Sequence, residues 1–466
     1  MAGSARTTET EGRKPRRSFL ARRWRFISLA IFLSALYVGQ FWFFQKVWCT
    51  PQDLYHRVWA TTQSNLFNQL ALKDWPAYEH KYDQRIKNHD DAIKFANEML
   101  ATLDDPFTRL FDQREVKKQS DAHSGFYSGV GMIMNGRKKP ILVRTIYQGG
   151  PAEKAGLEKG DQIMQVDDID CMKIDVSKIG EYTRAHMGKV ITFKIMRQGK
   201  PLTFEIIPVQ FVAQAVITKK LTADIAYVRI VSFINSDITA LIAAAFEKVK
   251  DAHALILDMR GNPGGNVNAC LAAAGMMLDS GELVTVISKD EGKDYLSMRY
   301  LLTADSLKIE YDIPGKSHRE ENSPRPKNVW GAKPIVVLVD DGSASAAEML
   351  AAALHDNKRA TILGVRTYGK GVAQLYYEMP VSTCLSVTAA RYYTPTKKWL
   401  GDGKGEGHID KDGKMVKACA ANQLHGITPD VVVQPVENLD YGCPEDNQVN
   451  AALRFLNKTT RPPLKL

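Results

Sequence analysis

The sequence lacks the residue patterns that mark metal centres, redox sites and nucleic-acid surfaces. Its ten histidines form no HExxH or comparable cluster, and its six cysteines show no CxxC spacing. It contains no internal repeat and no basic stripe interleaved with aromatic residues. We therefore expect no metal, no other cofactor and no nucleic-acid partner. The hydrophobic content of 44% and charged content of 24% are those of a globular protein.

The six cysteines are ordinary for a chain of 466 residues. If most of the chain is exported, disulfide bonds become possible. We favour a pair between Cys419 and Cys443, because both lie in the loop-rich C-terminal region. Cys270 and Cys384 lie in apolar runs and are expected to be small core residues.

The net charge of +10 is concentrated at the N-terminus, where residues 1–25 hold eight Arg and Lys but only two Glu. The next run, residues 26–44, has no charged residue and is long enough to cross about 30 Å of hydrocarbon. Tryptophans lie at its ends, and a basic flank belongs on the cytoplasmic side. We expect residues 1–25 to be a cytoplasmic tail, residues 26–48 a single transmembrane anchor, and the remaining chain an extracytoplasmic body, periplasmic or equivalent.

Two other interpretations of this N-terminus stay open. A cleaved signal peptide also begins with basic residues, although no small-x-small site closes the apolar run and bulky residues 41–44 would be poor neighbours for cleavage. The segment 16–20 resembles a twin-arginine export signal, a pairing that a flank this rich in arginine also produces by accident.

A chain of this length predicts two or three domains. Apolar residues recur at helical spacing in residues 49–125, and Pro106 ends the last of these helices. We expect this segment to be a helical lead-in to the later domains, with the alternative that it only separates them from the membrane. Residues 126–210 have the pattern of short strands and turns, and a larger core occupies residues 211–466. Within that core we expect residues 289–333 to be a rather irregular surface excursion, a lid or an interaction arm, and residues 397–417 to be a surface loop.

Three segments of the core combine a buried-type strand with a following loop of small residues. They begin at positions 254, 334 and 360, and the first two continue into helix-like runs. Open α/β sheets place their sites at the carboxyl ends of such strands. The loop of the first segment contains Gly264 and Gly265, whose bare backbone N–H groups could face a developing oxyanion.

The loops of the second and third segments supply Ser345 and Lys370. A serine at a strand-to-helix turn has its hydroxyl raised into the open, with free helix N–H groups behind it. Lys370 lies between Gly369 and Gly371, and desolvation in a crevice would lower its pKa toward neutrality. A neutral lysine can take the serine's proton, which is the chemistry of a Ser–Lys hydrolase. Taken alone, the small-residue string is also compatible with tight helix packing and the GKG string with an exposed turn.

Five segments between about Phe95 and Val433 resemble, in wording, order and spacing, the carboxyl-terminal processing peptidases. These are Ser–Lys proteases with an inserted PDZ domain, and the segments are ILDMRGNPGG, VLVDDGSASAAEMLAAAL, GVRTYGKGVAQ, VTAARYYTP and HGITPD. The resemblance implies a mixed α/β fold with a βαβ-type, crotonase-like protease core in residues 211–466. It also implies a PDZ domain in residues 126–210, after the helical segment and the membrane anchor.

The resemblance implies a role for each catalytic residue. Ser345 would be the nucleophile, Lys370 the general base, and Gln374, a helical turn or short loop further on, would orient the lysine. Ser343 is the competing nucleophile, but the 25-residue spacing to the lysine favours Ser345. The family often reads SASASE, so Ala347 replaces a serine here, at a position that is not the nucleophile.

The same resemblance implies an oxyanion hole that combines the Ala346 N–H with one N–H of the pair Gly264 and Gly265. The sequence leaves open which glycine donates.

The segment GGPAEKAGLEKGD, residues 149–161, is the most specific part of the PDZ resemblance. PDZ domains bind a peptide as an added strand whose terminal carboxylate meets backbone N–H groups of a loop. We assign that loop to Gly129, Val130, Gly131 and Met132, with the alternative that its glycines only form a tight turn.

The function expected from these features is that of a membrane-anchored serine endopeptidase that captures and trims the C-terminal tails of exported or membrane proteins. One alternative is a non-catalytic, membrane-tethered PDZ scaffold on a degenerate protease body. A second is an acyl-CoA enzyme built on the same strand–loop–helix repeat, for which the PDZ segment would have no purpose. The sequence leaves undecided whether the protein forms an oligomer, what its physiological substrate is, and whether the PDZ domain activates or blocks the active site.

Overall fold

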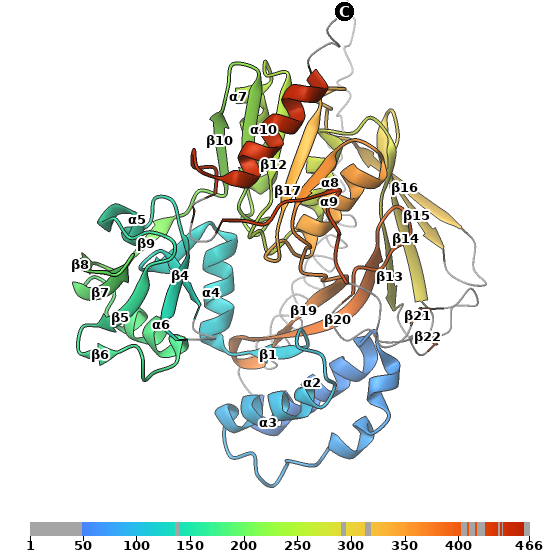
Figure 1. Ribbon diagram of the computed structural model, residues 1–466. Helices are drawn as coiled ribbons and strands as arrows, with labels where there is room; N and C mark the ends of the chain where they lie inside the picture. The colour runs from blue at the N-terminus through green and yellow to red at the C-terminus, as the bar shows by residue number, and fades with distance from the viewer. Residues whose placement is uncertain are drawn as a thin grey trace, which may run out of the picture.

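The computed structural model describes residues 49–135, 139–289, 295–312, 318–401, 408–409, 415–416, 425–436, 439 and 441–460. Within these residues three large sheets and their helices form the molecule (Figure 1). No helix in the described part of the chain is long and apolar enough to cross a membrane. The predicted anchor, residues 26–48, and the basic tail before it lie outside the described residues, as does Cys419.

A six-stranded sheet forms the centre of the core. Its strands lie side by side in chain order, and all neighbours are parallel except the first pair. Every residue of the two central strands is buried, as expected for parallel strands covered on both faces. The strands are β10 (Val216–Lys220), β11 (Ile225–Ile230), β12 (Ala254–Asp258), β17 (Ile335–Val339), β18 (Thr361–Gly364) and β23 (Val431–Val432).

Helices cover both faces of this parallel sheet. Three helices pack on one face: α7 (Ile238–Val249), α8 (Val267–Gly275) and α9 (Ala346–Asp356). The C-terminal helix α10 (Asn447–Thr460) covers the other face through buried Ala452 and Leu456. Cys270 is buried on α8, as predicted, whereas Cys384 is only partly buried. The loops after β12, β17 and β18 therefore meet at one edge of the sheet.

An antiparallel sheet lies beside the core. It has the order β1–β20–β13–β14–β15–β16, with β19 also paired to β20. Its strands are β1 (Arg109–Phe111), β13 (Gly281–Lys289), β14 (Tyr295–Leu302), β15 (Ser306–Asp312), β16 (Arg319–Pro324), β19 (Val372–Met379) and β20 (Thr383–Tyr393), with a short turn η3 (Pro380–Ser382) between the last two.

The excursion expected over residues 289–333 is not irregular, because β14, β15 and β16 form a regular antiparallel arm. β15 alternates polar residues with Leu307, Ile309 and Tyr311, a strand signal that the prediction overlooked, whereas β16 carries no large apolar residue. The predicted loop over residues 397–417 lies largely outside the described residues, which include only β21 (His408–Ile409) and β22 (Met415–Val416) of its middle.

The N-terminal helices belong to the body of the protein. They are α2 (Pro51–Asn65), the 3-10 turns η1 (Gln69–Leu72) and η2 (Trp75–Tyr78), α3 (His89–Ala101) and α4 (Gln113–His123). Apolar residues of all of these except α4 belong to, or pack against, a cluster that includes Met379, Leu385 and Val387 of the antiparallel sheet. The alternative that this segment is only a spacer is therefore wrong.

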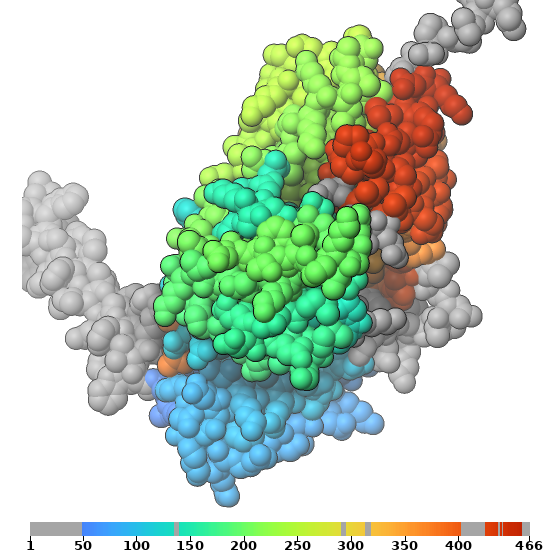
Figure 2. All heavy atoms as spheres, turned by 60° about the vertical axis from the view of Figure 1, so that its left-hand side comes forward, coloured from blue at the N-terminus to red at the C-terminus, as the bar shows by residue number. Residues whose placement is uncertain are grey.

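A smaller domain is inserted between α4 and the core. It contains β3 (Met132–Asn135), β4 (Ile141–Ile146), β5 (Gln162–Val166), β6 (Ile169–Asp170), β7 (Ile191–Arg197) and β8 (Lys200–Ile206), with helices α5 (Pro151–Ala155) and α6 (Val176–Ala185). It has a hydrophobic cluster of its own. The two-stranded pair β2 (Phe126–Gly129) and β9 (Val209–Val212) joins it to the body. Figure 2 shows this domain, in green, above the blue N-terminal helices.

Candidate active site

Ser345 lies at the turn between β17 and α9, where it is the residue before the first turn of the helix. Its backbone has φ of 55° and ψ of −120°, a conformation that residues other than glycine rarely adopt. Such a conformation costs roughly 1–3 kcal/mol and persists where the surroundings enforce it. Ser345 is partly exposed between buried Ala344 and Ala346. The sequence therefore folds into a strained strand-to-helix turn that lifts one hydroxyl out of the core.

Glu348 holds Ser345 and Lys370 side by side. Its Oε2 accepts the Ser345 N–H and the Lys370 N–H, both at 2.9 Å. Its Oε1 accepts from Thr367 Oγ1 at 2.5 Å and from the Gly369 N–H at 2.7 Å. The side chain is completely buried, and this burial raises the pKa of its carboxyl group. One carboxylate oxygen thus fixes the backbone of both candidate catalytic residues.

The Lys370 side chain is desolvated, and burial lowers the pKa of its ammonium group. The Asp105 and Glu348 carboxylates oppose this shift without reversing it. Nζ lies 4.3 Å from the centroid of the Phe107 ring. Among the described residues Lys370 Nζ forms no ion pair, so the lysine is held by an aromatic face and by its backbone. This is the environment that favours the neutral amine needed in a general base.

The turn after α3 reaches this site. Asp105 accepts the Phe107 N–H at 2.9 Å and the Thr108 hydroxyl at 2.6 Å, which fixes the turn. Thr108 in turn accepts the backbone N–H of Thr388 on β20 at 3.0 Å. The segment that the sequence indicated only as the end of a helix therefore supplies the ring beside Lys370.

Tyr392 of β20 lies between the two candidate catalytic residues. Its hydroxyl donates to the Lys370 carbonyl oxygen and shares a side-chain hydrogen bond with Ser345. The ring is buried, and this burial raises the pKa of the phenol well above its usual value. The hydroxyl therefore stays protonated and can hold the Ser345 side chain.

The glycine turn after β12 approaches Ser345 closely. A Cβ on Gly264 would lie 2.8 Å from the Ser345 Cβ and 2.9 Å from the Ala346 N. The Gly264 N–H already donates to Asn262 Oδ1 at 2.8 Å. Among the described residues, the N–H groups of Gly265 and Ala346 have no hydrogen-bond acceptor. These two amides are the donors that remain available at this turn.

Gln374 lies on β19 and not on a helical turn or loop, at a bulge where the register with β20 shifts. Its Nε2 donates to Thr388 Oγ1 at 3.2 Å. Among the described residues it has no hydrogen bond to Lys370. An orienting role for Gln374 stays a prediction.

Ser343 has a structural hydrogen-bond pattern. Its hydroxyl is buried, donates to the Met259 carbonyl at 2.8 Å and accepts the Asp340 N–H at 3.0 Å. A hydroxyl that already links two strand ends is poorly available for attack. The geometry favours Ser345 over Ser343 as the nucleophile.

The predicted peptide-binding loop is packed against the start of α5. The Val130 carbonyl accepts the Ala152 N–H at 2.7 Å, and a Cβ on Gly131 would lie 3.0 Å from Pro151 Cδ. Close packing thus accounts for Gly131. In the described sheet β3, which begins at Met132, is an edge strand with β4 as its neighbour. An edge strand can accept an added strand, so the peptide-binding prediction remains tenable.

Two groups of described side chains have metal-ligand atoms within 4.8 Å of one another. The first contains His56, His80 and Asp83, whose carboxylate already accepts from both imidazoles at 2.8 and 2.9 Å. The second contains Glu310 of β15, His318 and Glu320 of β16. Neither group includes a residue of the candidate site.

Comparison with known proteins agrees with this geometry. The family model for peptidase family S41 matches residues 224–414, and the model for a PDZ domain matches residues 142–197. A chloroplastic C-terminal processing peptidase of Tetradesmus obliquus is 32% identical over 360 residues, which cover 73% of this chain and 71% of the relative. The chain belongs to the carboxyl-terminal processing peptidases of family S41. It is a serine-type peptidase.

Other relatives span most of this peptidase. A carboxyl-terminal-processing protease of a Picosynechococcus strain is 29% identical over 423 residues, which cover 87% of this chain and 89% of the relative. The solved structure of a photosystem II D1 C-terminal processing protease is similar with a TM-score of 0.55 and 25% identity, covering 82% of this chain and 93% of that one. The mixed α/β fold with a PDZ domain, predicted from the sequence, is confirmed.

The structure of this processing peptidase adds three residues to those expected from the sequence: Phe107, Glu348 and Tyr392. A Glu three residues after Ser345 has the spacing of a capping box, which was a usable signal. Phe107 and Tyr392 lie far from Ser345 in the sequence, and no local pattern connects them to it.

Proposed function

We propose that this peptidase cuts its substrates with Ser345 as nucleophile, Lys370 as general base and Gln374 as a residue that orients the lysine. The observation that carries the proposal is the Glu348 carboxylate, whose single oxygen binds the backbone N–H groups of both Ser345 and Lys370. The lowered pKa of Lys370 supports its role as a base.

The proposed reaction has two halves. Lys370 takes the proton of Ser345 as its oxygen attacks the scissile carbonyl, and the N–H groups of Ala346 and Gly265 stabilise the oxyanion. Gly264 does not donate to the oxyanion, because its own N–H is bound to Asn262 Oδ1. Its lack of a side chain lets the glycine turn lie close to Ser345. Protonated Lys370 then gives its proton to the leaving amine. A water activated by the same lysine releases the acyl group.

The substrate proposed is the C-terminal tail of an exported or membrane protein. The PDZ domain would pair the tail with the edge of β3, and Gly129, Val130, Gly131 and Met132 would meet its carboxylate. The exposed Ile133 beside them favours apolar terminal residues. Residues 26–48 would anchor the enzyme, with residues 1–25 in the cytoplasm and the catalytic body in the periplasm or its equivalent. A crotonase-like arrangement of the core and an oligomeric assembly remain predictions.

Cleavage of an unfolded test protein with an apolar C-terminal tail tests the proposal. We expect the full-length wild type in detergent to cleave it, and Ser345→Ala and Lys370→Ala to leave it intact. The same test protein with two aspartates added at its C-terminus should be cut more slowly, because the PDZ domain is proposed to favour apolar terminal residues. Equal cleavage by all three enzymes would contradict the catalytic assignment.

The alternative of a non-catalytic PDZ scaffold has a distinct signature in the same experiment. A scaffold would bind the apolar tail without cleaving it, in wild type and variants alike. The strained backbone of Ser345 and the buried setting of Lys370 favour the enzyme over the scaffold.

A further inference from the structure

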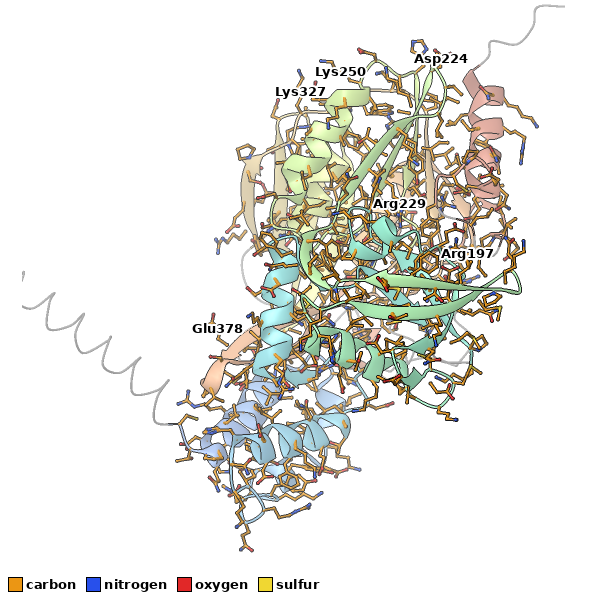
Figure 3. The ribbon with its side chains drawn as sticks, turned by 90° about the vertical axis from the view of Figure 1, so that its left-hand side faces the viewer. Arg197, Asp224, Arg229, Lys250, Lys327 and Glu378 are labelled. Atoms are coloured by element: carbon orange, nitrogen blue, oxygen red, sulfur yellow. The ribbon has the colours of Figure 1, made fainter. Side chains whose placement is uncertain are left out.

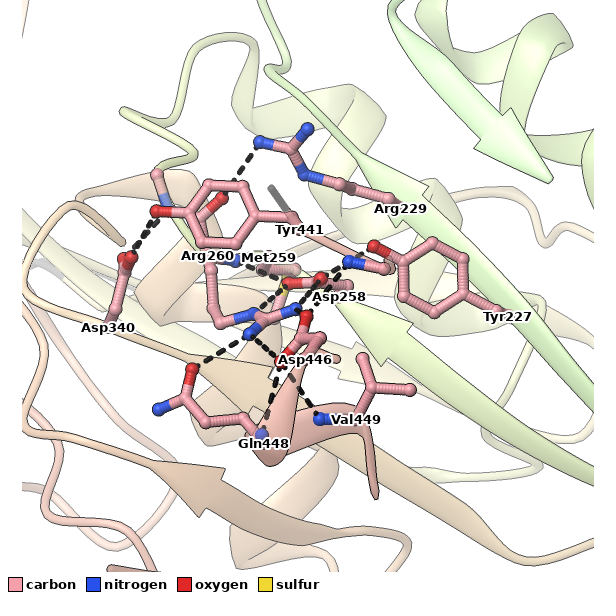
Figure 4. A network of polar contacts seen from close by, with 12 residues as sticks. Tyr227, Arg229, Asp258, Met259, Arg260, Asp340, Tyr441, Asp446, Gln448 and Val449 are labelled. Carbon is pink, nitrogen blue, oxygen red and sulfur yellow. Dashed lines mark hydrogen bonds and ion pairs between the residues drawn. The ribbon is translucent and has the colours of Figure 1, made fainter. Parts of the chain in front are cut away.

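A buried polar network joins the C-terminal segment to the two turns of the active site. Tyr441 precedes α10, and its hydroxyl donates to Asp340 Oδ2 at 2.8 Å. The other oxygen of Asp340 accepts the Gly261 N–H at 2.7 Å and the Gly342 N–H at 3.0 Å. Gly261 begins the turn that carries Gly264 and Gly265, and Gly342 lies three residues before Ser345. Asp340 therefore ties together the turn that holds the oxyanion and the turn that holds the nucleophile. Figure 4 shows its hydrogen bond with Tyr441.

The same C-terminal segment binds the glycine turn a second time. Arg260 is 2% exposed and precedes Gly261. Its guanidinium donates to both oxygens of Asp446, at 3.0 and 2.7 Å, and to Gln448 Oε1 at 2.8 Å. Asp446 Oδ2 also accepts the N–H of Gly442, the residue after Tyr441. Asp446 thus holds both Arg260, at the start of the oxyanion turn, and the backbone next to Tyr441.

The ring of Tyr441 lies among three cations. The guanidinium carbons of Arg229 and Arg260 lie 4.4 and 4.6 Å from its centroid, and Lys159 Nζ of the PDZ domain lies 4.5 Å from it. Figure 3 shows Arg229 on β11, close to the PDZ domain. Desolvation, with Asp340 second, raises the pKa of the Tyr441 phenol above its usual value. Its hydroxyl is therefore a hydrogen-bond donor to Asp340 at any working pH.

We propose that Tyr441 is a positioning residue for proteolysis, whose hydroxyl acts through Asp340 to set the distance between the oxyanion turn and Ser345. The proposal rests on the catalytic assignment proposed above. The reason is geometric: an oxyanion donor is effective only when it lies within hydrogen-bond distance of the developing charge. A small displacement of the turn lowers the rate of the chemical step, whereas the PDZ domain that is proposed to bind the substrate tail keeps its contacts.

The test is Tyr441→Phe in the full-length enzyme, which removes the hydroxyl and keeps the ring that the three cations contact. Tyr311→Phe is the matched control, because the Tyr311 hydroxyl also donates to a carboxylate, Glu321 Oε2, at 2.8 Å, but on the β15–β16 arm. Rates are normalised to the number of active sites, titrated with a serine-reactive fluorophosphonate. We expect kcat of Tyr441→Phe to fall about tenfold with KM unchanged, and that of Tyr311→Phe to stay at the wild-type value.

A double-mutant cycle separates positioning from general stability. On an Asp340→Ala background, Tyr441→Phe should cause little further loss of kcat, because the acceptor through which the hydroxyl acts is already absent. A full second loss on that background would overturn the proposal. So would a normalised kcat of Tyr441→Phe equal to that of Tyr311→Phe.

Failure of the catalytic assignment gives a different result. If Ser345→Ala cleaves as fast as the wild type, the proposed nucleophile is wrong and the positioning proposal falls with it. If Ser345→Ala is inactive and Tyr441→Phe has wild-type kcat, only the positioning proposal falls.

Discussion

Replacement of Glu348 tests how the two catalytic turns are held together. In Glu348→Gln, one oxygen becomes an NH₂ group. The less costly rotamer puts that nitrogen at the Oε1 position, where the Thr367 hydroxyl can accept from it. The remaining oxygen then keeps both the Ser345 and the Lys370 N–H groups. The Gly369 N–H and the Thr367 O–H both lose Oε1 as their acceptor. Because the Thr367 hydroxyl accepts a hydrogen bond in return, the net cost is mainly that of the buried Gly369 donor, roughly 1–3 kcal/mol of stability.

Two further effects of Glu348→Gln oppose each other. Neutral acceptors are weaker than a carboxylate, which adds to the loss. Relief of the buried charge, whose cost is visible in the raised pKa of Glu348, reduces it. We therefore expect the variant to fold, to lose about 1–3 kcal/mol of stability and to keep kcat within about tenfold of the wild type. Glu348→Ala should be far worse, because four buried donors lose their acceptor, at about 1–3 kcal/mol each.

Thermal unfolding and steady-state peptidase assays on the same preparations measure these effects. Glu282→Gln is a suitable control, since Glu282 is a partly buried carboxylate that accepts from Thr285 Oγ1 at 2.7 Å and from Arg299 at 3.2 Å, on the antiparallel sheet. Wild-type kcat in Glu348→Ala would refute the role given to this carboxylate. An inactive Glu348→Gln with wild-type stability would also refute it, because the carboxylate would then take part in the chemistry.

Three other predictions concern single residues of the site. Gly264→Ala should abolish peptidase activity, because the added Cβ would lie 2.8 Å from Ser345 Cβ, whereas Gly331→Ala, also at positive φ but in open space, should lose only stability. Asp105→Asn should shift the rise of kcat/KM with pH to lower pH, because the Asp105 charge raises the pKa of Lys370, which must be neutral to act as a base. Glu98→Gln on α3 is the charge-matched control. An unchanged pH profile in Asp105→Asn would contradict the assignment of Lys370 as base. Ser343→Ala should cost about 1–3 kcal/mol in thermal unfolding but leave the enzyme active, and an inactive, stable variant would reopen the choice of nucleophile.

The elements that carry the site were largely predictable from local sequence. The strands before Gly264, Ser345 and Lys370 are continuous apolar runs, which is the sequence pattern of parallel strands that are buried on both faces. In the β14–β16 arm the alternation of Leu307, Ile309 and Tyr311 in β15 was a usable strand signal, whereas the polar sequence of β16 gave none.

The parts of the site that the sequence did not predict are contacts between distant segments. Phe107 reaches Lys370 only because α3 packs on the antiparallel sheet, and Tyr392 does so only through the register of β20. Gln374 was expected on a helical turn or short loop and lies on a strand, since β19 pairs with β20 from Val372 onward. The proposed choice of Gly265 over Gly264 depends on the hydrogen bond from the Gly264 N–H to Asn262 Oδ1; Asn262 is part of the motif, but the sequence does not show which amide its side chain binds.

The most direct test of the central claim is to locate the reactive serine. The full-length enzyme is treated with a fluorophosphonate at high pH, digested and analysed by mass spectrometry, alongside Lys370→Ala. The account predicts one phosphonylated residue, Ser345, in the wild type, and labelling that is slowed at least about a hundredfold in Lys370→Ala, a size typical of the loss of a general base. Labelling of Ser343, or labelling of Ser345 at an equal rate without Lys370, would contradict it.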